Sequence, residues 1–531
     1  MRKLGLRRSA RDQIMSRFLN RLCEVTQDAS KFGPDWQISH AYNALAVLLD
    51  EFTVEIANGI KQGVSGQASH DLLQYLSSAL PALLFATPFV STLRILNKGR
   101  ELNGQLSDAF HLKPEGTAKR VLWFSDTIAD LNGVSVTMQE LAESAHKEKA
   151  PLRLAGCPTE SERRLPVTDQ MLSLPCIYEV TPTFYNAHTV RFPSLLRSLD
   201  MIDLARPDKI VISTPGPVGL TGYLAARILG IPCVGVYHTD FTKQAEEVIE
   251  DRQMVDVVGS YINWFYARMD AILVPSQNYM TRLADQGHDR SRMRLFRRGL
   301  GESFRQVNAR HLREAEARWF RGGAATLLYT GRLGKEKNLE LLAEVFERLR
   351  SEGLSVRLLI VGDGPEQAAL ERQFAQHKTE VCFTGRLDRE ILKALYQLSD
   401  VLVFPSTTDT FGMSVLEAQT LGLPALVSQC GGPQEIIVDG KTGYALDTTS
   451  VERWTDTCRT LVEARLSNPT SYKAWRDEIK SIFATRYTWK SLIDEITEKT
   501  APGEHPGERL TATNSAPSLD RHHLKAQTLL V

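Results

Sequence analysis

Short apolar runs alternate with amphipathic helical segments along most of this chain, and this alternation limits its fold more than any other feature. A first series of runs comprises residues 121–126, 209–214, 233–240 and 271–276. A second series comprises residues 326–333, 356–364, 381–387, 401–406 and 425–428. Runs of this length are typical of strands buried on both faces, and the helices between them indicate parallel βαβ units. We therefore predict an α/β protein with two doubly wound, Rossmann-like domains that face each other across a cleft.

Length and composition set the expected domain limits. The chain has 531 residues, which suggests about three domains, or two large domains with extensions. We assign residues 118–305 to a first Rossmann-like domain and residues 306–500 to a second one with C-terminal helices. Residues 1–117 carry apolar side chains at helical spacing, so we expect a helical extension, whose role the sequence does not indicate. Residues 501–531 are rich in Gly, Pro, Ser and Thr, and we expect a disordered tail.

Charge and cysteine content exclude several functional classes. Lys and Arg together number 63, as do Asp and Glu, so no overall basic field favours a nucleic-acid partner. The seven cysteines are scattered and include no C-x-x-C pair. Such a set is typical of reduced thiols in the cytoplasm rather than of a disulfide framework or a zinc site.

One stretch near the N-terminus is a candidate for contact with a membrane. Residues 72–93 contain no charged side chain, and a segment of that length can span a bilayer. Pro81, Pro88, Gln74 and several hydroxyl residues interrupt it, which favours buried or interfacial helices over a true span. We expect peripheral contact with the inner face of a membrane through this stretch or the first domain.

The loop GRLGKEKN at 331–338 follows a predicted strand and precedes a predicted helix. Arg332 and Lys337 are thus expected at the carboxyl end of a strand, where open α/β sheets bind ligands. Two cations beside helix N–H groups suit a phosphate or a diphosphate. The other interpretation is a solvated loop rich in Lys and Arg.

The segment DTFGMSVLEA at 409–418 places two carboxylates on the next loop and helix. Asp409 lies in the loop, and Glu417 lies two turns into an otherwise apolar helix. A carboxylate accepts hydrogen bonds from two adjacent hydroxyls, so Glu417 suits a ribose diol. Stabilisation of a helix start by an acidic residue would explain Asp409, but not Glu417.

Glycine-containing loops form a third group of candidates. Gly362 and Gly364 in VGDGP lie in a loop that lets backbone approach a ligand. Gly133 precedes the first helix of the first domain, where N–H groups can bind an anion. Many strand-to-helix turns look alike, so neither signal is specific by itself.

His238 ends the strand VGVYH, and a histidine at that place is a candidate for contact with a sugar or an acceptor. A core or surface histidine is the alternative. The arginines between 290 and 298 form a basic cluster that we interpret as a solvated face, although a membrane or nucleic-acid patch is the competing interpretation.

In combination, these motifs resemble glycosyltransferase family 4, the retaining, nucleotide-sugar-dependent enzymes of the GT-B fold. The resemblance covers roughly residues 118–490 and rests on GRLGKEKN, on STTDTFGMSVLEA as an E-x7-E motif, and on CGGPQEIIVDGKTGY at 430–444. HTDF at 238–241 and RRGL at 297–300 are similar to members that glycosylate lipids. Two departures stand out: Asp409 replaces the first Glu of E-x7-E, and LNGV replaces the usual Gly-Gly-Val.

The resemblance implies a role for each matched residue. Arg332 and Lys337 would neutralise the leaving diphosphate, Glu417 would hold the ribose, and Asp409 would contact the transferred sugar. Gly133, with Gly362 and Gly364, would line the donor site, and His238 would contact the sugar or orient the acceptor. A nucleoside-diphosphate sugar is then a co-substrate, and no cofactor or metal is expected, because cations take the place of Mg²⁺.

The acceptor implied is a lipid or a glycan. Two other functions stay open at this point: a nucleotide-sugar epimerase of similar architecture, and a catalytically silent scaffold that binds sugar nucleotides or membranes.

Overall fold

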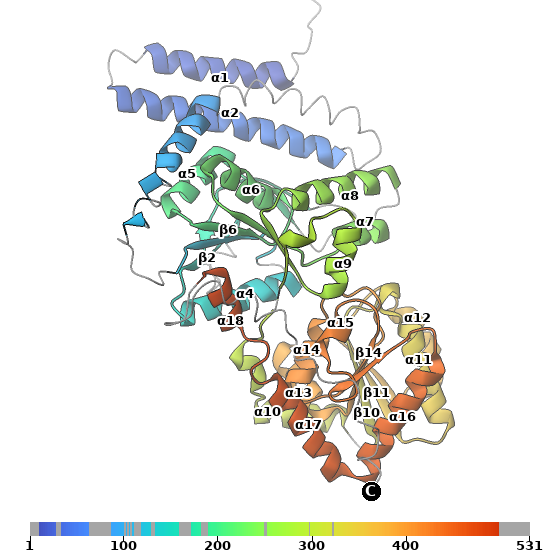
Figure 1. Ribbon diagram of the computed structural model, residues 1–531. Coiled ribbons are helices and arrows are strands. Elements are labelled where there is room, and N and C mark those ends of the chain that lie inside the picture. Colours follow the sequence, from blue (N-terminus) through green and yellow to red (C-terminus); the bar gives the residue numbers. More distant parts are fainter. Residues whose placement is uncertain are drawn as a thin grey trace, which may run out of the picture.

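The computed structural model contains two α/β units and a helical N-terminal part (Figure 1). It describes residues 10–27, 33–62, 86–99, 102–103, 106, 109–110, 118–128, 133–158, 171–181, 189–248, 252–296, 298–320 and 323–498. The predicted disorder of 501–531 and most of the charge-free stretch, residues 72–85, lie outside these residues. Among the helices described, none is both long and apolar enough to cross a membrane.

The first domain is built on a seven-stranded sheet in the order β3-β2-β1-β6-β7-β8-β9, and each neighbouring pair is parallel. Its strands are β1 (Val121–Phe124), β2 (Leu152–Gly156), β3 (Leu172–Ser173), β6 (Lys209–Ile212), β7 (Cys233–Val236), β8 (Ala271–Val274) and β9 (Met293–Leu295). Its helices are α4 (Gly133–Lys147), α5 (Leu195–Ala205), α6 (Pro217–Leu229), α7 (Phe241–Val248), α8 (Arg252–Ala267) and α9 (Gln277–Asp285). An antiparallel pair, β4 (Cys176–Val180) and β5 (Val190–Pro193), stands apart from the sheet.

The second domain repeats this plan with a six-stranded parallel sheet in the order β12-β11-β10-β13-β14-β15. Its strands are β10 (Ala325–Thr330), β11 (Val356–Val361), β12 (Val381–Gly385), β13 (Val401–Phe404), β14 (Ala425–Ser428) and β15 (Gly443–Leu446). Its helices are α10 (Ala309–Trp319), α11 (Leu339–Ser351), α12 (Gln367–Gln373), α13 (Arg389–Leu398), α14 (Met413–Thr420), α15 (Pro433–Ile436), α16 (Val451–Ser467) and α17 (Pro469–Phe483). In both sheets the strand order reverses beside the first strand, so each has a switch point.

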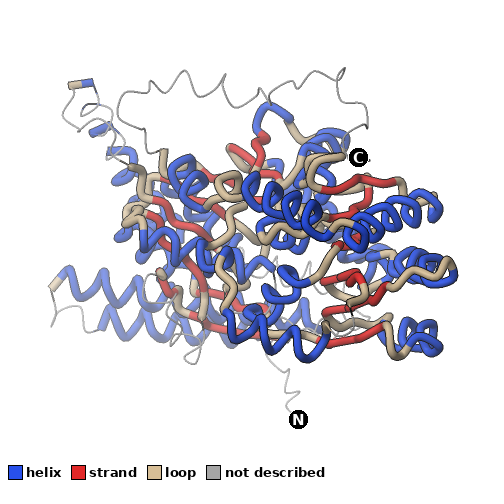
Figure 2. The backbone as a smooth tube through the Cα atoms, turned by 90° about the horizontal axis from the view of Figure 1, so that it is seen from below, coloured by secondary structure: helices blue, strands red, loops and turns tan. Residues whose placement is uncertain are grey.

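The strands are buried because helices cover both faces of each sheet. Figure 2 shows the strands lying between layers of helices. All residues of β1, β10, β13 and β14 are buried. Continuous apolar runs therefore identify these strands in the sequence. The prediction of two doubly wound α/β domains is confirmed.

The last helix, α18 (Trp489–Ile496), leaves the second domain and packs beside α4 (Figure 1). Trp489, Leu492 and Ile493 belong to one buried cluster with Trp123 of β1. The end of the segment that we assigned to the second domain thus contributes to the core of the first. This crossing ties the two domains together.

The described N-terminal residues are helical, as their apolar spacing predicts. α1 (Ala10–Gln27) and α2 (Pro34–Gln62) lie side by side, and α2 packs on α5 (Figure 1). Residues 86–99 are also helical, and Phe89 and Leu93 pack against the core of the first domain. The described end of the charge-free stretch is therefore a helix with one buried side.

Candidate active site

The candidate site lies at the switch point of the second sheet. β10 pairs with β11 on one side and with β13 on the other. The loop after β10 leads into a 3₁₀ turn, Lys335–Lys337, and the loop after β13 leads into α14. Both loops leave the carboxyl edge of the sheet, where the motifs were expected to meet.

Lys337 and Asp409 come together across this switch point. The Lys337 Nζ donates to Asp409 Oδ2 at 2.8 Å, and the two side chains are 14% and 24% exposed. Lys337 was expected to face a diphosphate, and in this structure its partner is the carboxylate expected to face the sugar. Arg332 is exposed, and no ion pair of its guanidinium occurs within the described residues.

Gly362 and Gly364 shape the site by close packing of backbone on backbone. A Cβ on Gly362, whose φ is +127°, would lie 1.9 Å from the carbonyl oxygen of Gly331. A Cβ on Gly364 would lie 2.3 Å from the carbonyl oxygen of Leu333. These glycines were expected to let backbone approach a ligand. In the structure they let this loop approach the loop that carries Arg332, and any ligand contact of theirs stays a prediction.

Glu417 lies inside the second domain as the fifth residue of α14, one turn into the helix instead of the two that the sequence suggested. Tyr396 donates its hydroxyl to Glu417 Oε2 at 3.0 Å, and the Arg389 guanidinium lies 3.7 Å from Oε1. Burial raises the pKa of Glu417 to about 7, although Arg389 and the Tyr396 hydroxyl act in the opposite direction. Glu417 therefore titrates in the neutral range, and its ability to accept two hydroxyl groups depends on pH.

The first domain contributes α4, β7 and their loops. Gly133 begins α4, and the loop 129–132 before it lies outside the described residues. His238, just after β7, is buried. Its backbone carbonyl accepts from Thr410 Oγ1 at 2.9 Å, so the loop of Asp409 is joined directly to the first domain.

Both ring nitrogens of His238 are engaged within the protein. Arg298 donates from Nη2 to Nδ1 at 2.5 Å, and Ser213 Oγ lies 3.0 Å from Nε2. Because Nδ1 accepts, Nε2 carries the proton and donates to Ser213. Burial and the Arg298 charge hold the pKa of His238 well below its usual range, so the ring is neutral. The expected sugar contact of His238 stays a prediction and would need one of these partners to move.

The interpretation of the 290–298 arginines as a solvated face holds for Arg290, Arg292 and Arg294, which are exposed, but is wrong for Arg298. Arg298 is buried, and burial lowers the pKa of its guanidinium to about 10. Its charge lies 5.8 Å from the ring centre of Phe411 and 6.0 Å from that of Phe296. This arginine therefore belongs to the contact between the domains, which local alternation of polar and apolar residues could not reveal.

Sequence reasoning missed three further charged residues, one at the switch point of the first sheet and two in the contact between the domains. Asp126, after β1, accepts from the backbone N–H of Val218 at 2.8 Å and so caps α6 at the switch point of the first sheet. Glu140 on α4 contacts Arg389 of α13 across the domains. A carboxylate directly after a buried strand was a usable signal for Asp126. Glu140 and Arg389 sit on amphipathic helices among many charges, and nothing local singles them out.

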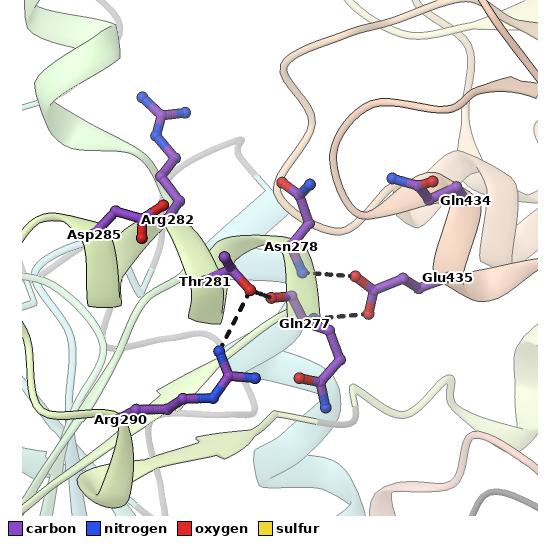
Figure 3. A pocket seen from close by; sticks show the side chains of 8 residues that line it. All are labelled: Gln277, Asn278, Thr281, Arg282, Asp285, Arg290, Gln434 and Glu435. Carbon is purple, nitrogen blue, oxygen red and sulfur yellow. Dashed lines mark hydrogen bonds between the residues drawn. The ribbon is translucent and has the colours of Figure 1, made fainter.

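An open surface pocket of about 660 Å³ lies between α9 and α15 (Figure 3), and Lys337, Asp409 and Glu417 are not among the residues that line it. α9 lines one side and α15 the other. Glu435 crosses between the domains, because its carboxylate accepts from the backbone N–H groups of Gln277 and Asn278 at 2.8 and 2.9 Å. The lining residues are Gln277, Asn278, Thr281, Arg282, Asp285, Arg290, Gln434 and Glu435.

Comparison with known proteins agrees with this geometry. The family model described as "Glycosyl transferases group 1" matches residues 314–481, and "Glycosyltransferase Family 4" matches residues 131–302. The chain is 32% identical to a GDP-mannose-dependent alpha-mannosyltransferase of Mycobacterium tuberculosis (strain CDC 1551 / Oshkosh), over 51% of this chain and 68% of the relative. It is 31% identical to the sulfoquinovosyl transferase SQD2 of Arabidopsis thaliana, over 56% of this chain. The chain spans 58% of SQD2 and 65% of a Mycolicibacterium smegmatis mannosyltransferase.

Solved structures show the same fold. The crystal structure of Anabaena HepE in complex with UDP aligns over 71% of this chain and 98% of HepE, with a TM-score of 0.56 and 14% identity. The sucrose-phosphate synthase of Thermosynechococcus elongatus aligns over 74% of this chain and 99% of its own, with a TM-score of 0.56 and 16% identity. The expected GT-B architecture is thus confirmed as a fold.

Titration of Glu417 predicts a specific dependence of stability on pH. The folded-state pKa of about 7 exceeds the ordinary value of 4.5, so the folded state binds the proton more tightly. This contribution to stability is present at low pH and is lost as pH rises from about 4.5 to 7. Between pH 5 and pH 8, the titration of Glu417 should lower the free energy of unfolding of the wild type by about 2 kcal/mol. The variant Glu417→Gln should not show this decrease.

Chemical denaturation of both proteins at pH 5 and pH 8 measures this difference. The variant should lose less stability than the wild type over that interval. An equal loss in the two proteins would mean that Glu417 is ionised throughout, and the pKa assignment would be wrong.

Proposed function

Because the chain belongs to glycosyltransferase family 4, we propose that it transfers a sugar from a nucleoside-diphosphate sugar to an acceptor hydroxyl with retention of configuration. One observation carries the proposal: Lys337 bonds to Asp409 across the switch point, and Glu417 accepts from the Tyr396 hydroxyl, which also lies 2.9 Å from Thr330 Oγ1 at the end of β10. The UDP named for HepE and the GDP-mannose named for the mannosyltransferases support a nucleotide donor.

The cations of the 331–338 loop supply the electrostatic part of the reaction. Departure of a nucleoside diphosphate develops negative charge, which fixed cations stabilise most strongly in a partly buried site. Lys337 has three N–H donors, and Asp409 takes one of them. Lys337 can therefore keep Asp409 in place and donate to a phosphate oxygen at the same time. Arg332 adds a second cation from the exposed side.

The carboxylates fix the two ends of the donor. Glu417 accepts the ribose hydroxyls, and Asp409, held by Lys337, accepts from a hydroxyl of the transferred sugar. The acceptor then attacks from the face that the diphosphate leaves, which retains the configuration. Gly133 places the helix start of α4 opposite the donor, where its N–H groups favour a phosphate.

The acceptor is proposed to be a lipid or a glycan presented by a membrane. Large apolar side chains are exposed along the described residues between 95 and 110; Ile95 is 71% exposed and Phe110 is 69% exposed. Arg94 and Lys98 are exposed on the same helix. Apolar side chains next to cations suit an interface with anionic lipids. We therefore propose peripheral association on the cytoplasmic face.

Two alternative functions predict other outcomes. An epimerase would change the donor sugar without any acceptor, and a silent scaffold would bind the nucleotide sugar without turnover. The family's transferase motifs at 331–338 and 409–417 favour transfer over both. Incubation with UDP-, GDP- and ADP-sugars, with and without a membrane lipid extract, separates the three.

Replacement Lys337→Met should lower turnover by about 10²–10³-fold, because the lost cation stabilises the leaving diphosphate. Lys335→Met is the matched control, since Lys335 is exposed and lies in the same 3₁₀ turn. Turnover is measured with the sugar nucleotide that the wild type consumes, in buffer with EDTA. Equal rates for the two variants would remove Lys337 from the mechanism.

Introducing charge into the exposed apolar strip should release the protein from vesicles. The double replacement Ile95→Asp and Phe110→Asp should abolish flotation with vesicles that contain anionic lipid, because it removes apolar burial and adds repulsion. Leu466→Asp, on α16 of the second domain, is the control and should float like the wild type. Flotation of the double variant at wild-type levels would contradict this membrane contact.

A further inference from the structure

One guanidinium lies between carboxylates of the two domains. Arg389 begins α13, and its Nη2 lies 3.7 Å from Glu417 Oε1 of the same domain. The same Nη2 contacts Glu140 Oε1 on α4 of the first domain. The centre of the guanidinium lies 5.0 Å from the ring centre of Phe304, which supports its plane.

Glu140 is itself fixed, so it can hold Arg389 in place. Trp489 Nε1 donates to Glu140 Oε2 at 3.1 Å, and the backbone N–H of Gly301 donates to the same oxygen at 3.4 Å. Trp489 is buried at the crossing of α18 onto the first domain. The anchor of Arg389 therefore rests on the core of the first domain and not on a mobile surface chain.

The charge of Arg389 offsets part of the cost of burying the ionised Glu417 carboxylate. The side chains of Glu140 and Glu417 are only 10% and 14% exposed, and the charge of Glu140 raises the pKa of Glu417. Three groups face Glu417: Arg389 and Tyr396 from α13 favour its ionised form, and Glu140 from α4 opposes it. Tyr396 engages Oε2, which leaves the orientation of Oε1 to Arg389.

We propose that Arg389 is a positioning residue for the donor: anchored on Glu140, it holds the Glu417 carboxylate aimed at the ribose hydroxyls. The inference rests on the proposed function, in which Glu417 holds the ribose. It adds that recognition of the ribose depends on a residue of the opposite domain. The donor site is then complete only while α4 and α13 stay in contact.

The test compares ribose and deoxyribose nucleotides. Calorimetry first finds which of UDP, GDP and ADP binds the wild type, and then compares that nucleotide with its 2′-deoxy and 3′-deoxy forms from pH 5.5 to 8.5. A hydrogen bond to a carboxylate should give the wild type about a tenfold or larger preference for the ribose form above pH 7. The preference should decline as Glu417 is protonated.

The variants are expected to shift the pH midpoint of the ribose preference in different directions. Arg389→Gln should move the pH midpoint of this preference upward and reduce the preference at pH 7 about threefold or more, because a cation is lost. Arg389→Lys keeps the charge and should restore the midpoint. Glu140→Gln removes both a negative neighbour and the anchor of Arg389, so it should move the midpoint downward and reduce the ribose preference above that midpoint. Arg372→Gln, an exposed arginine that donates within its own helix, should match the wild type.

Four outcomes overturn the proposal. An unchanged midpoint in Arg389→Gln, even with a lower melting temperature, would mean that Arg389 only joins the domains. A shift of Glu140→Gln in the same direction as Arg389→Gln would contradict the charge argument, and Glu140→Gln decides this even if Arg389→Gln fails to fold. Absence of binding of all three nucleotides to the wild type would overturn the proposed function and this inference together, whereas binding without ribose preference overturns the inference alone.

Discussion

Direct packing of one backbone loop on another at the carboxyl edge of the second sheet is the constraint on which the site depends. Gly362 and Gly364 leave no room for a Cβ against the carbonyl oxygens of Gly331 and Leu333. The backbone N–H of Leu333 donates to the Asp363 carbonyl at 2.8 Å, which locks the two loops together. This contact fixes the loop that carries Lys337, and the Lys337 ammonium is thereby held within hydrogen-bond distance of Asp409.

The charges of the site are held by contacts between the domains as much as by either domain alone. Thr410 bonds to the His238 carbonyl, Glu435 bonds to the first turn of α9, and Glu140 contacts Arg389. The Glu140 side chain is only 10% exposed, and its burial weakens solvent screening, so its pairing with Arg389 acts more strongly than it would on an open surface. Burial also raises the pKa of Glu417. Domain contact and donor recognition are therefore physically coupled.

The sequence allowed the fold and the centre of the site to be predicted because both depend on local patterns. The apolar runs at 325–330 and 401–404 are buried on both faces, so they stand out along the chain. The motifs place Lys337 and Asp409 after these two strands, and neighbouring parallel strands bring their loops together. Edge strands of two or three residues, such as Leu172–Ser173 and Met293–Leu295, are too short to show any periodicity.

Contacts over long sequence distances could not be predicted in this way. The burial of Arg298, the crossing of Trp489 onto the first domain and the pairing of Glu140 with Arg389 all depend on how two finished domains meet. For the same reason, the sequence did not indicate that Gly362 and Gly364 pack against a neighbouring loop, and their ligand contact stays a prediction.

Hydrogen exchange with and without a nucleoside diphosphate tests the central claim most directly, namely that the donor binds at the switch point of the second sheet. Peptides that cover residues 331–338 and 409–420 should exchange more slowly when the nucleotide binds, because the ligand closes these loops. Peptides that cover residues 277–290, along the neighbouring cavity, should exchange at an unchanged rate. Protection confined to residues 277–290 would contradict the assignment of the donor site.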